Sequence, residues 1–360
     1  SDSDYDRLAP QRWPVSRHRQ GGRFFAQGQF FHPDGKARML PVRWRPPAAR
    51  PDLHSPFRLN TGRIRDQWHT MTRTGKAPRL SGHLAEPFAD IHPVDARKLG
   101  IKPADLLRLH NPQGQAILRA RITTEVQPGD LFVPIHWTGE TAPAARIDEL
   151  VAAALDPVSG QPESKGAVVA VARWQPAWYG FAVSCQPMTP RSQYWAMTRT
   201  SAGYRAELAG QSPLEDLVST ARDLFALPKA EVQMMTDRNR GIARLALLQN
   251  GKVMAALFTA PEPVALRREY LAALLGTCAA GILTGLPTEG QPDPGPVVCA
   301  CFSVGSNTIL QAIKSDGLIS VAEVGAALQA GTNCGSCRSD IAGLLARGSP
   351  EPPPPVAPRG

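Results

Sequence analysis

The chain of 360 residues is 42% hydrophobic and 20% charged, which is typical of a folded protein with about two or three domains. Its formal net charge of +9 favours an anionic ligand or partner, but charge alone does not separate nucleic acid from a phosphorylated cofactor or an acidic protein. Six cysteines exclude a disulfide scaffold, and the longest apolar stretch, Leu271–Leu286, is shorter than the ~20 residues of a membrane-spanning helix. Because the sequence also has no signal-peptide pattern, we expect a cytoplasmic protein that does not contact a membrane.

Residues 1–50 are rich in arginine and proline and do not predict an independent domain. Within them, residues 29–35 (Gln-Phe-Phe-His-Pro-Asp-Gly) predict a strand that ends in a turn. We interpret residues 1–50 as the tail end of a catalytic region that is truncated upstream.

Residues 51–173 consist of short apolar runs separated by Gly, Pro and Asn. Residues 106–122 predict a β-hairpin, because two apolar runs flank the turn residues Asn111–Gly114. Only Asp95–Leu99 and Ala144–Ala154 have helical patterns. We therefore expect a compact β-barrel with small helical insertions.

Residues 174–286 predict a small α+β domain. Ser212, followed by Pro213 and Glu215, has the pattern of a capping box and predicts a helix that runs to about Leu227. A final helix is predicted from about Val264. The predicted strands are Glu231–Met235, Ala243–Leu248 and Val253–Phe258. No residue of this domain points to a chemical role.

The C-terminal part divides into a linker (287–296), a compact mini-domain (297–347) and a tail rich in Pro, Ala and Gly (348–360) that we expect to be disordered. In the mini-domain, serines and glycines delimit two amphipathic helices. The expected helices are Asn307–Asp316, capped by Ser306, and Val321–Ala330, capped by Ser320. Such a helix pair folds the chain back on itself.

Two close pairs of cysteines flank these helices, so the fold-back brings the pairs together. They are Cys299 with Cys301, and Cys334 with Cys337. Four thiolates suit either tetrahedral zinc or an iron–sulfur cluster. Cys-x-Cys is unusual for a zinc knuckle, and the small residues around the second pair leave backbone N–H groups free to bond cluster sulfurs. We predict an electron-transferring [2Fe–2S] cluster, with zinc and redox-active thiols as alternatives.

The segment Leu59–Gly75 has the hydrogen-bond donors of an anion site: two glycines, four threonines and three arginines, against the single acid Asp66. Trp68 and His69 are able to stack on a heterocycle or bond to it. A basic solvated loop and a nucleic-acid patch remain open on composition alone. The chain has no Walker or Rossmann glycine pattern to strengthen a nucleotide site.

Two runs in this segment, Asn-Thr-Gly-Arg and Gln-Trp-His-Thr-Met-Thr-Arg-Thr-Gly, closely resemble the C-terminal domain of the molybdopterin oxidoreductase superfamily. They are most similar to bacterial assimilatory nitrate reductases. Further runs that share the resemblance are 28–37, 86–88, 92–96, 134–137 and 156–165. Residues 299–305, Cys-x-Cys-Phe-x-Val-Gly, resemble the opening of bacterioferritin-associated-ferredoxin-like (BFD-like) [2Fe–2S] domains.

The resemblance implies a double-psi β-barrel that binds Mo-bis(molybdopterin guanine dinucleotide), in a mixed β and α+β chain. The residues that it implies for dinucleotide contact are Thr61, Gly62, Arg63, Trp68, His69, Thr70, Thr72, Arg73 and Thr74. His136, Trp137 and Lys165 are implied at the approach to the pterin. Asp148 departs from the family, which tends to have Asn there, and a carboxylate is less suited than an amide to contact phosphate.

The implied activity is reduction of nitrate to nitrite, with electrons entering from a flavoprotein or ferredoxin-type donor and passing through the [2Fe–2S] cluster. The [4Fe–4S] motif and the molybdenum ligand of such enzymes are not in this sequence, so we expect no catalytic residue here and no activity of the chain alone. Alternatives are another reaction of the superfamily, such as formate oxidation, a non-enzymatic electron-transfer module, and a nucleic-acid-binding protein with a zinc clip. The resemblance favours a partner that is not nucleic acid.

Overall fold

The computed structural model describes residues 6–10, 18, 22–41, 43–278, 281–287 and 292–348. The predicted tail beyond Gly348 and part of the predicted linker lie outside these residues. The chain divides into two units, residues 1–46 and 47–360. The strand predicted at residues 29–35 is wrong: the Phe30 N–H donates to the Gly35 carbonyl (2.8 Å), because a turn with Gly35 at φ +66° reverses the chain.

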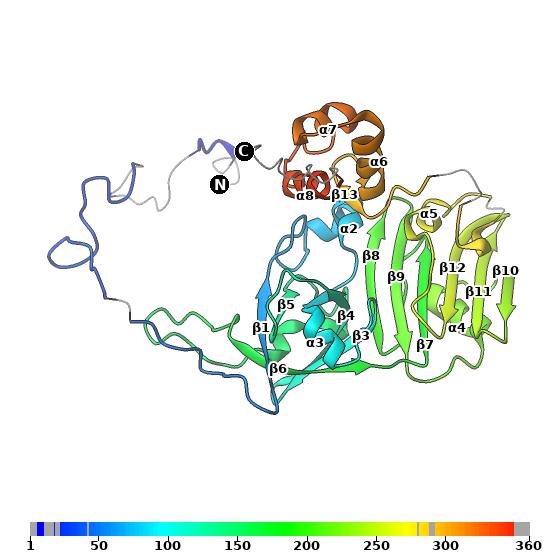
Figure 1. The fold of residues 1–360 in the computed structure, drawn as a ribbon, viewed down its shortest axis with the longest axis horizontal. Helices are drawn as coiled ribbons and strands as arrows, with labels where there is room; N and C mark the ends of the chain where they lie inside the picture. The colour runs from blue at the N-terminus through cyan, green and yellow to red at the C-terminus, as the bar shows by residue number, and fades with distance from the viewer. Residues whose placement is uncertain are drawn as a thin grey trace, which may run out of the picture. The chain divides into compact units, whose positions relative to one another are not determined.

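In the second unit, six strands close into a barrel in the order β1-β5-β2-β4-β3-β6 (Figure 1). The strands are β1 (Phe57–Gly62), β2 (Phe88–Ile91), β3 (Leu106–Asn111), β4 (Gly114–Ile122), β5 (Asp130–Pro134) and β6 (Ala167–Trp174). β1 and β5 are parallel, as are β2 and β4, and the other pairs are antiparallel. The predicted barrel and the β3–β4 hairpin are confirmed.

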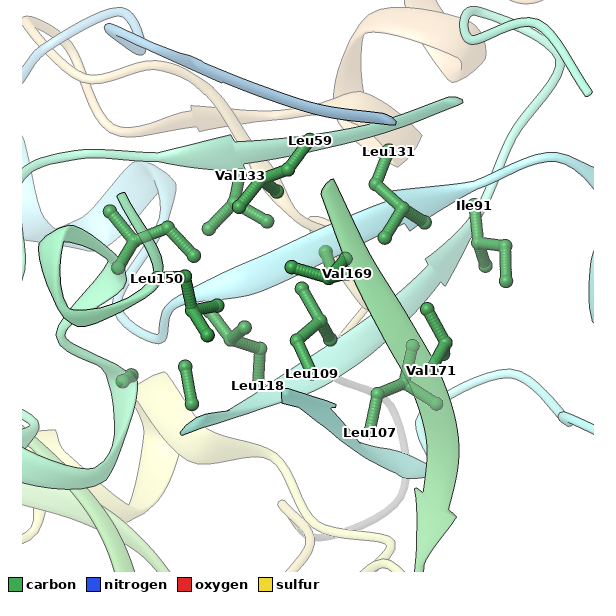
Figure 2. Packing of buried hydrophobic residues seen from close by; sticks show 14 of the residues in the cluster. Leu59, Ile91, Leu107, Leu109, Leu118, Leu131, Val133, Leu150, Val169 and Val171 are labelled. Carbon is green, nitrogen blue, oxygen red and sulfur yellow. The ribbon is translucent and has the colours of Figure 1, made fainter. Parts of the chain in front are cut away.

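The barrel closes around an apolar core because its strands alternate inward and outward side chains. In β1, Phe57 and Leu59 are buried while Arg58 and Asn60 are exposed. Figure 2 shows leucine, isoleucine and valine side chains from several strands converging in the barrel interior. Leu59 and Leu118, from β1 and β4, have no exposed surface.

Short helices decorate the barrel. α3 (Pro93–Lys98) begins two residues before the predicted helix, because Pro93 occupies its first turn and the His92 side chain accepts the Val94 N–H. The predicted helix Ala144–Ala154 is wrong: it is replaced by two 3-10 helices, between which Arg146 has extended backbone angles. Those helices are η2 (Pro143–Ala145) and η3 (Ile147–Leu150); η1 (Thr74–Lys76) and α2 (Pro78–His83) were not predicted.

Next comes an antiparallel six-stranded sheet in the order β10-β11-β12-β7-β9-β8. Its strands are β7 (Trp178–Ser184), β8 (Tyr194–Thr200), β9 (Gly203–Gly210), β10 (Glu231–Asp237), β11 (Ile242–Gln249) and β12 (Lys252–Ala260). The three predicted strands correspond to β10, β11 and β12. α4 (Leu217–Phe225) packs on one face, and α5 (Arg268–Ala273) with η4 (Ile282–Thr284) on the other. The mixed β and α content is therefore confirmed.

Both helix starts in this region differ from the prediction. α4 begins five residues after Ser212, because the Asp216 carboxylate accepts the Ser219 N–H (3.0 Å) and acts as the N-cap. The capping box at Ser212 is therefore wrong. α5 begins at Arg268 rather than at Val264.

The cysteine module contains a two-stranded ribbon and three helices. They are β13 (Val297–Cys299), β14 (Val304–Gly305), α6 (Ser306–Asp316), α7 (Val321–Leu328) and α8 (Arg338–Gly348). The Ser320 hydroxyl caps α7 as predicted, but α6 is capped by Gly305, so that Ser306 is its first residue. α7 ends before the predicted Ala330, because Gln329 takes a left-handed conformation. α8 was not predicted; its Ile341 completes the module's core.

Candidate functional site

The four module cysteines approach one another across the two sequence pairs. The Cys301 and Cys334 sulfurs are 3.4 Å apart. Cys299 and Cys337 hydrogen-bond to each other through their side chains and are both 2% exposed, within the module core. The helix pair therefore brings the cysteine pairs together as the sequence predicts, with one couple of thiols buried and the other facing outward.

This arrangement supplies the thiols of a dinuclear cluster. In a [2Fe–2S] cluster four cysteines serve two irons, so that each iron takes two of them. Two thiol couples from one compact module supply the ligands that a dinuclear cluster requires.

The two couples differ in their electrostatics. The Ser336 hydroxyl, the Ser336 N–H and the Cys301 thiol lower the pKa of Cys334. Burial, together with the neighbouring Cys299, raises the pKa of Cys337 to about 11. Because a cluster binds thiolates, the positive charge of iron would offset the cost of ionising Cys337.

The end of β1 and the tightly turned segment that follows it are here called the cofactor loop (residues 61–75). Three of its residues other than glycine have left-handed backbone angles: Asp66 (φ +71°), His69 (φ +46°) and Met71 (φ +61°). Such conformations are costly and persist only where surrounding contacts enforce them. The Thr74 hydroxyl supplies one such contact, accepting the Trp68 N–H (3.2 Å) and donating to the side chain of Gln67 (2.8 Å).

His136, which follows β5, holds this loop through both of its ring nitrogens. Its Nε2 accepts the Ile64 N–H (3.0 Å), so its Nδ1–H donates to the His69 carbonyl (2.6 Å). The ring has no exposed surface, and burial lowers the pKa of His136, helped by the charges of Arg63 and His69. Both ring nitrogens are thus used within the protein, which gives His136 a role in shaping the loop. Trp137, 5% exposed, packs in the barrel core.

The other predicted residues gather at the C-terminal end of β1. Thr61 is buried and donates to the Ser164 carbonyl (2.8 Å), while the Lys165 ammonium donates to the Thr61 carbonyl. The Arg63 guanidinium lies over the Trp68 ring at 5.6 Å, with Trp68 54% exposed. The further exposed side chains of the loop are His69, Thr70, Thr72 and Arg73, while Thr74 is half-buried. A Cβ atom on Gly62 would collide with the Phe132 ring, so the position suits glycine.

Asp148 lies elsewhere on the barrel surface. It is exposed in η3, which packs on β4 and β6 rather than on β1. Its position therefore adds no support for a contact with a ligand on the cofactor loop.

Sequence reasoning missed the residues that join this loop to the cysteine module. Arg65 donates to the Val298 carbonyl (2.7 Å) and the Asp340 carboxylate (2.6 Å). Arg79 donates to the Cys301 carbonyl (3.3 Å). α2 also packs on β13, and Figure 1 shows α2 beside the module. The only signal in the sequence was Asp66, the single acid of the basic segment.

Comparison with known families agrees with both parts of this site. Residues 57–168 match the molybdopterin dinucleotide binding domain, and residues 297–347 match the BFD-like [2Fe-2S] binding domain. The chain thus has one segment similar to each of these two domain families. The two matches confirm the predicted cofactors, a molybdopterin dinucleotide and a [2Fe–2S] cluster.

Relatives named nitrate reductase confirm the resemblance seen in the sequence. A nitrate reductase of Klebsiella oxytoca is 36% identical over 350 residues, which are 95% of this chain and 39% of the relative. The assimilatory nitrate reductase catalytic subunit of Bacillus subtilis is 32% identical over 48% of this chain and 24% of its own length. An F420-dependent formate dehydrogenase subunit alpha of Methanocaldococcus jannaschii is 33% identical over 45% of this chain and 23% of its own length.

The chain thus spans 39% or less of the length of these relatives. None of the helices in the described part of the chain has the length and apolarity to cross a membrane.

Proposed function

We propose that this chain is the cofactor-binding and electron-relaying part of a molybdenum oxidoreductase that reduces nitrate to nitrite. The observation that carries the proposal is the direct contact of the cysteine module with the cofactor loop through Arg65, and with the following helix α2 through Arg79. A one-electron carrier placed against a dinucleotide-binding loop suits a relay. The identity to nitrate reductases over 95% of the chain supports nitrate as the substrate.

In this proposal the exposed part of the cofactor loop binds one guanine dinucleotide. The guanidinium groups of Arg63 and Arg73 are suited to grip pyrophosphate, and the loop threonines supply hydroxyl donors. The exposed Trp68 ring offers a stacking surface for a heterocycle. When bound, the molybdenum cofactor supplies the oxygen-atom-transfer chemistry, while the residues of the chain hold the cofactor in one orientation.

We also assign the barrel to the double-psi type, with domain limits of 51–173, 174–286 and 297–347. The parallel pairings of β1 with β5 and of β2 with β4, inside an otherwise antiparallel closed barrel, support this assignment. The proposed electron donor is a flavoprotein or a ferredoxin-type protein, which suits the one-electron chemistry of the cluster.

A second candidate is formate oxidation, favoured by the similarity to the formate dehydrogenase subunits of two methanogens. Those matches cover 45% and 31% of this chain, each less than half of the 95% covered by the match to the Klebsiella relative. A non-enzymatic electron-transfer module would bind iron and sulfide but no dinucleotide.

The test is cofactor analysis of anaerobically purified protein. We expect about two irons and two sulfides per chain, and binding of molybdopterin guanine dinucleotide measured by pterin fluorescence. Cys334→Ser should abolish the cluster and spare pterin binding, and Arg73→Ala should do the reverse. Zinc in place of iron, or a cluster without dinucleotide binding, would exclude the proposal. Turnover of nitrate against formate by an enzyme containing this chain decides the substrate.

A further inference from the structure

The contact between the cysteine module and the cofactor loop centres on Arg65. Only 16% of its side chain is exposed. One terminal nitrogen binds the Asp340 carboxylate in α8, and the other binds the Val298 carbonyl, immediately before Cys299. One guanidinium therefore holds the module at two points, one beside each cysteine pair, although both partners are more than 230 residues away.

Asp66 makes the second half of the contact. Its left-handed backbone (φ +71°) accompanies a carboxylate that is only 7% exposed. The carboxylate lies 3.1 Å from Arg65 Nε and 3.2 Å from His83 Nδ1, and the Ser336 hydroxyl donates to it at 3.4 Å. Burying a carboxylate is costly unless charged or hydrogen-bonding partners surround it. Asp66 is thus committed to the contact and unavailable to an anionic ligand.

These contacts lie beside one of the two thiol couples of the cluster site. Ser336, which bonds Asp66, lies 3.1 Å from the Cys334 sulfur, and Arg79 bonds the Cys301 carbonyl. Cys301 and Cys334 form the outer thiol couple, whereas Cys299 and Cys337 are buried among the module's helices. The outer couple therefore lies on the side where the module meets the cofactor loop.

The barrel and the module each have an apolar core of their own. Between them, α2 packs on β13, and the polar contacts of Arg65 and Asp66 lie beside this packing. Hydrogen bonds depend on direction, so the bonds of Arg65 to Asp340 and Val298, and the bond of Ser336 to Asp66, favour one orientation of the module.

We propose that Arg65 and Asp66 are positioning residues that hold the module with its Cys301/Cys334 edge toward the cofactor loop. The assignment of this edge as the exit for electrons rests on the proposed function. The positioning itself does not, because it concerns only contacts within this chain.

The test measures the position of the module directly. Cys278 is exposed and lies outside the module, so a spin label on its thiol, in a Cys185→Ala background, gives a reference point. Pulsed electron paramagnetic resonance then measures the distance from the label to the reduced cluster in the holoprotein. We expect one narrow distance distribution in the parent protein, and a distribution at least twice as broad in Arg65→Ala and Asp66→Asn with unchanged iron content.

Two further variants keep the result interpretable. Arg58→Ala removes an exposed barrel arginine that pairs with Asp130 and does not touch the module, so it should leave the distribution narrow. Asp340→Asn loosens the contact from the module side without altering the barrel, and tests the proposal if the Arg65 variant does not fold. A narrow distribution in Asp66→Asn and Asp340→Asn would overturn the positioning role.

The outcome is separable from that of the proposed function. Broadening of the distance distribution without dinucleotide binding would support the positioning role and contradict the relay. In an enzyme containing this chain, Arg65→Ala should also slow reoxidation of the cluster by substrate at least tenfold. An unchanged reoxidation rate together with a broadened distribution would overturn the assignment of the exit edge.

Discussion

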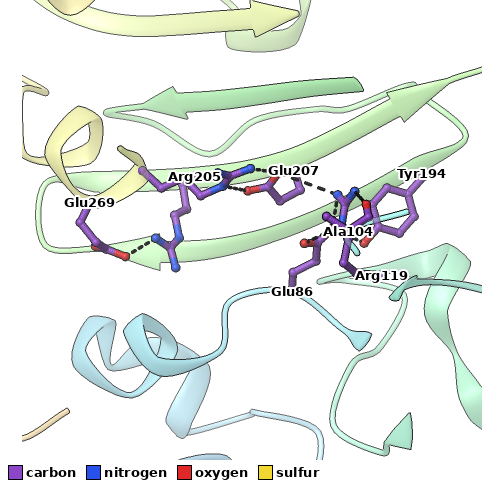
Figure 3. Close-up of polar contacts among 8 residues, drawn as sticks. Glu86, Ala104, Arg119, Tyr194, Arg205, Glu207 and Glu269 are labelled. Atoms are coloured by element: carbon purple, nitrogen blue, oxygen red, sulfur yellow. Dashed lines mark hydrogen bonds and ion pairs between the residues drawn. The ribbon is translucent and has the colours of Figure 1, made fainter. Parts of the chain in front are cut away.

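The Tyr194 hydroxyl in β8 donates to the Glu86 carboxylate at 2.5 Å and so ties the six-stranded sheet to the barrel. Glu86 in turn accepts two bonds from Arg119 Nε and one from Arg119 Nη2. Figure 3 shows this cluster continuing from Arg119 to Glu207 in β9, and Arg205 of the same strand paired with Glu269. We infer that the six-stranded sheet holds the barrel in a fixed position, because the charged side chains at the junction find their partners only when the sheet and the barrel are packed together.

Arg119→Met is therefore expected to destabilise the protein strongly. The Arg119 side chain is 14% exposed, and its removal takes away the arginine that pairs with Glu86, which is 18% exposed, while Glu207 keeps its ion pair with Arg268. Breaking one side of a buried ion pair costs about 3–5 kcal/mol. Urea unfolding measures the loss, and Arg58→Met, in an exposed pair with Asp130, should cost less than ~1 kcal/mol. Equal losses in the two variants would contradict the prediction.

The same network makes stability depend on acid pH through Glu207. Burial acts to raise the pKa of Glu207, but Arg268, Arg119 and Arg205 outweigh it, so the pKa is lowered from its usual 4.5. The unfolded chain then binds the proton more readily than the folded one, and this stabilisation is present above pH 4.5 and lost as the pH falls below it. Unfolding free energies at about pH 3 to 6 should fall less steeply with acidification in Glu207→Gln.

His136 should make the cofactor loop sensitive to pH. Because burial lowers its pKa below the usual 6.5, the folded protein keeps the ring neutral where the unfolded chain binds a proton. The stabilisation is complete above pH 6.5 and declines as the pH falls. Protonated Nε2 no longer accepts the Ile64 N–H, so we expect the loop to open on acidification.

The loop opening is measured as the difference in fluorescence between the parent and Trp68→Phe, titrated with pH. His136→Asn keeps a donor and an acceptor without titrating and should flatten the curve. His136→Ala leaves the Ile64 N–H and the His69 carbonyl unpaired and should cost about 1–3 kcal/mol. A pH response that persists in His136→Asn would assign the opening to another group.

Gly305→Ala is expected to prevent cluster binding. A Cβ atom at Gly305 would overlap the backbone carbonyls of Pro294 and Gly295, which lie in the segment just before β13. These are backbone atoms, so relief requires moving β13 and with it Cys299. Absorption of the purified protein should show loss of the cluster, whereas Gly343→Ala, which has open space in α8, should retain it. A Gly305→Ala protein with full iron content would contradict this reading of the packing.

Local signals in the sequence predicted the elements whose geometry depends on neighbouring residues. The β3–β4 hairpin follows from Asn111, whose side chain accepts the Gln113 and Gly114 N–H groups within the turn. The start of α4 was misplaced because two acceptable caps lie close together. Ser212 does not cap the helix, because its carbonyl accepts the Trp178 indole N–H (2.9 Å) from β7. That contact joins residues that are distant in the sequence.

The sequence by itself determined the barrel and the two predicted cofactors, and it predicted the four cysteines and the loop as their sites, because turn chemistry, cysteine spacing and family motifs are all local patterns. Only the tertiary structure decided what Arg65, Asp66 and Glu86 do. Each is an ordinary charged residue until its partner arrives from more than 100 residues away, at Asp340, Ser336 and Tyr194. A buried charge acquires its role from the groups that offset its desolvation, and those groups come together only when the barrel, the sheet and the cysteine module pack.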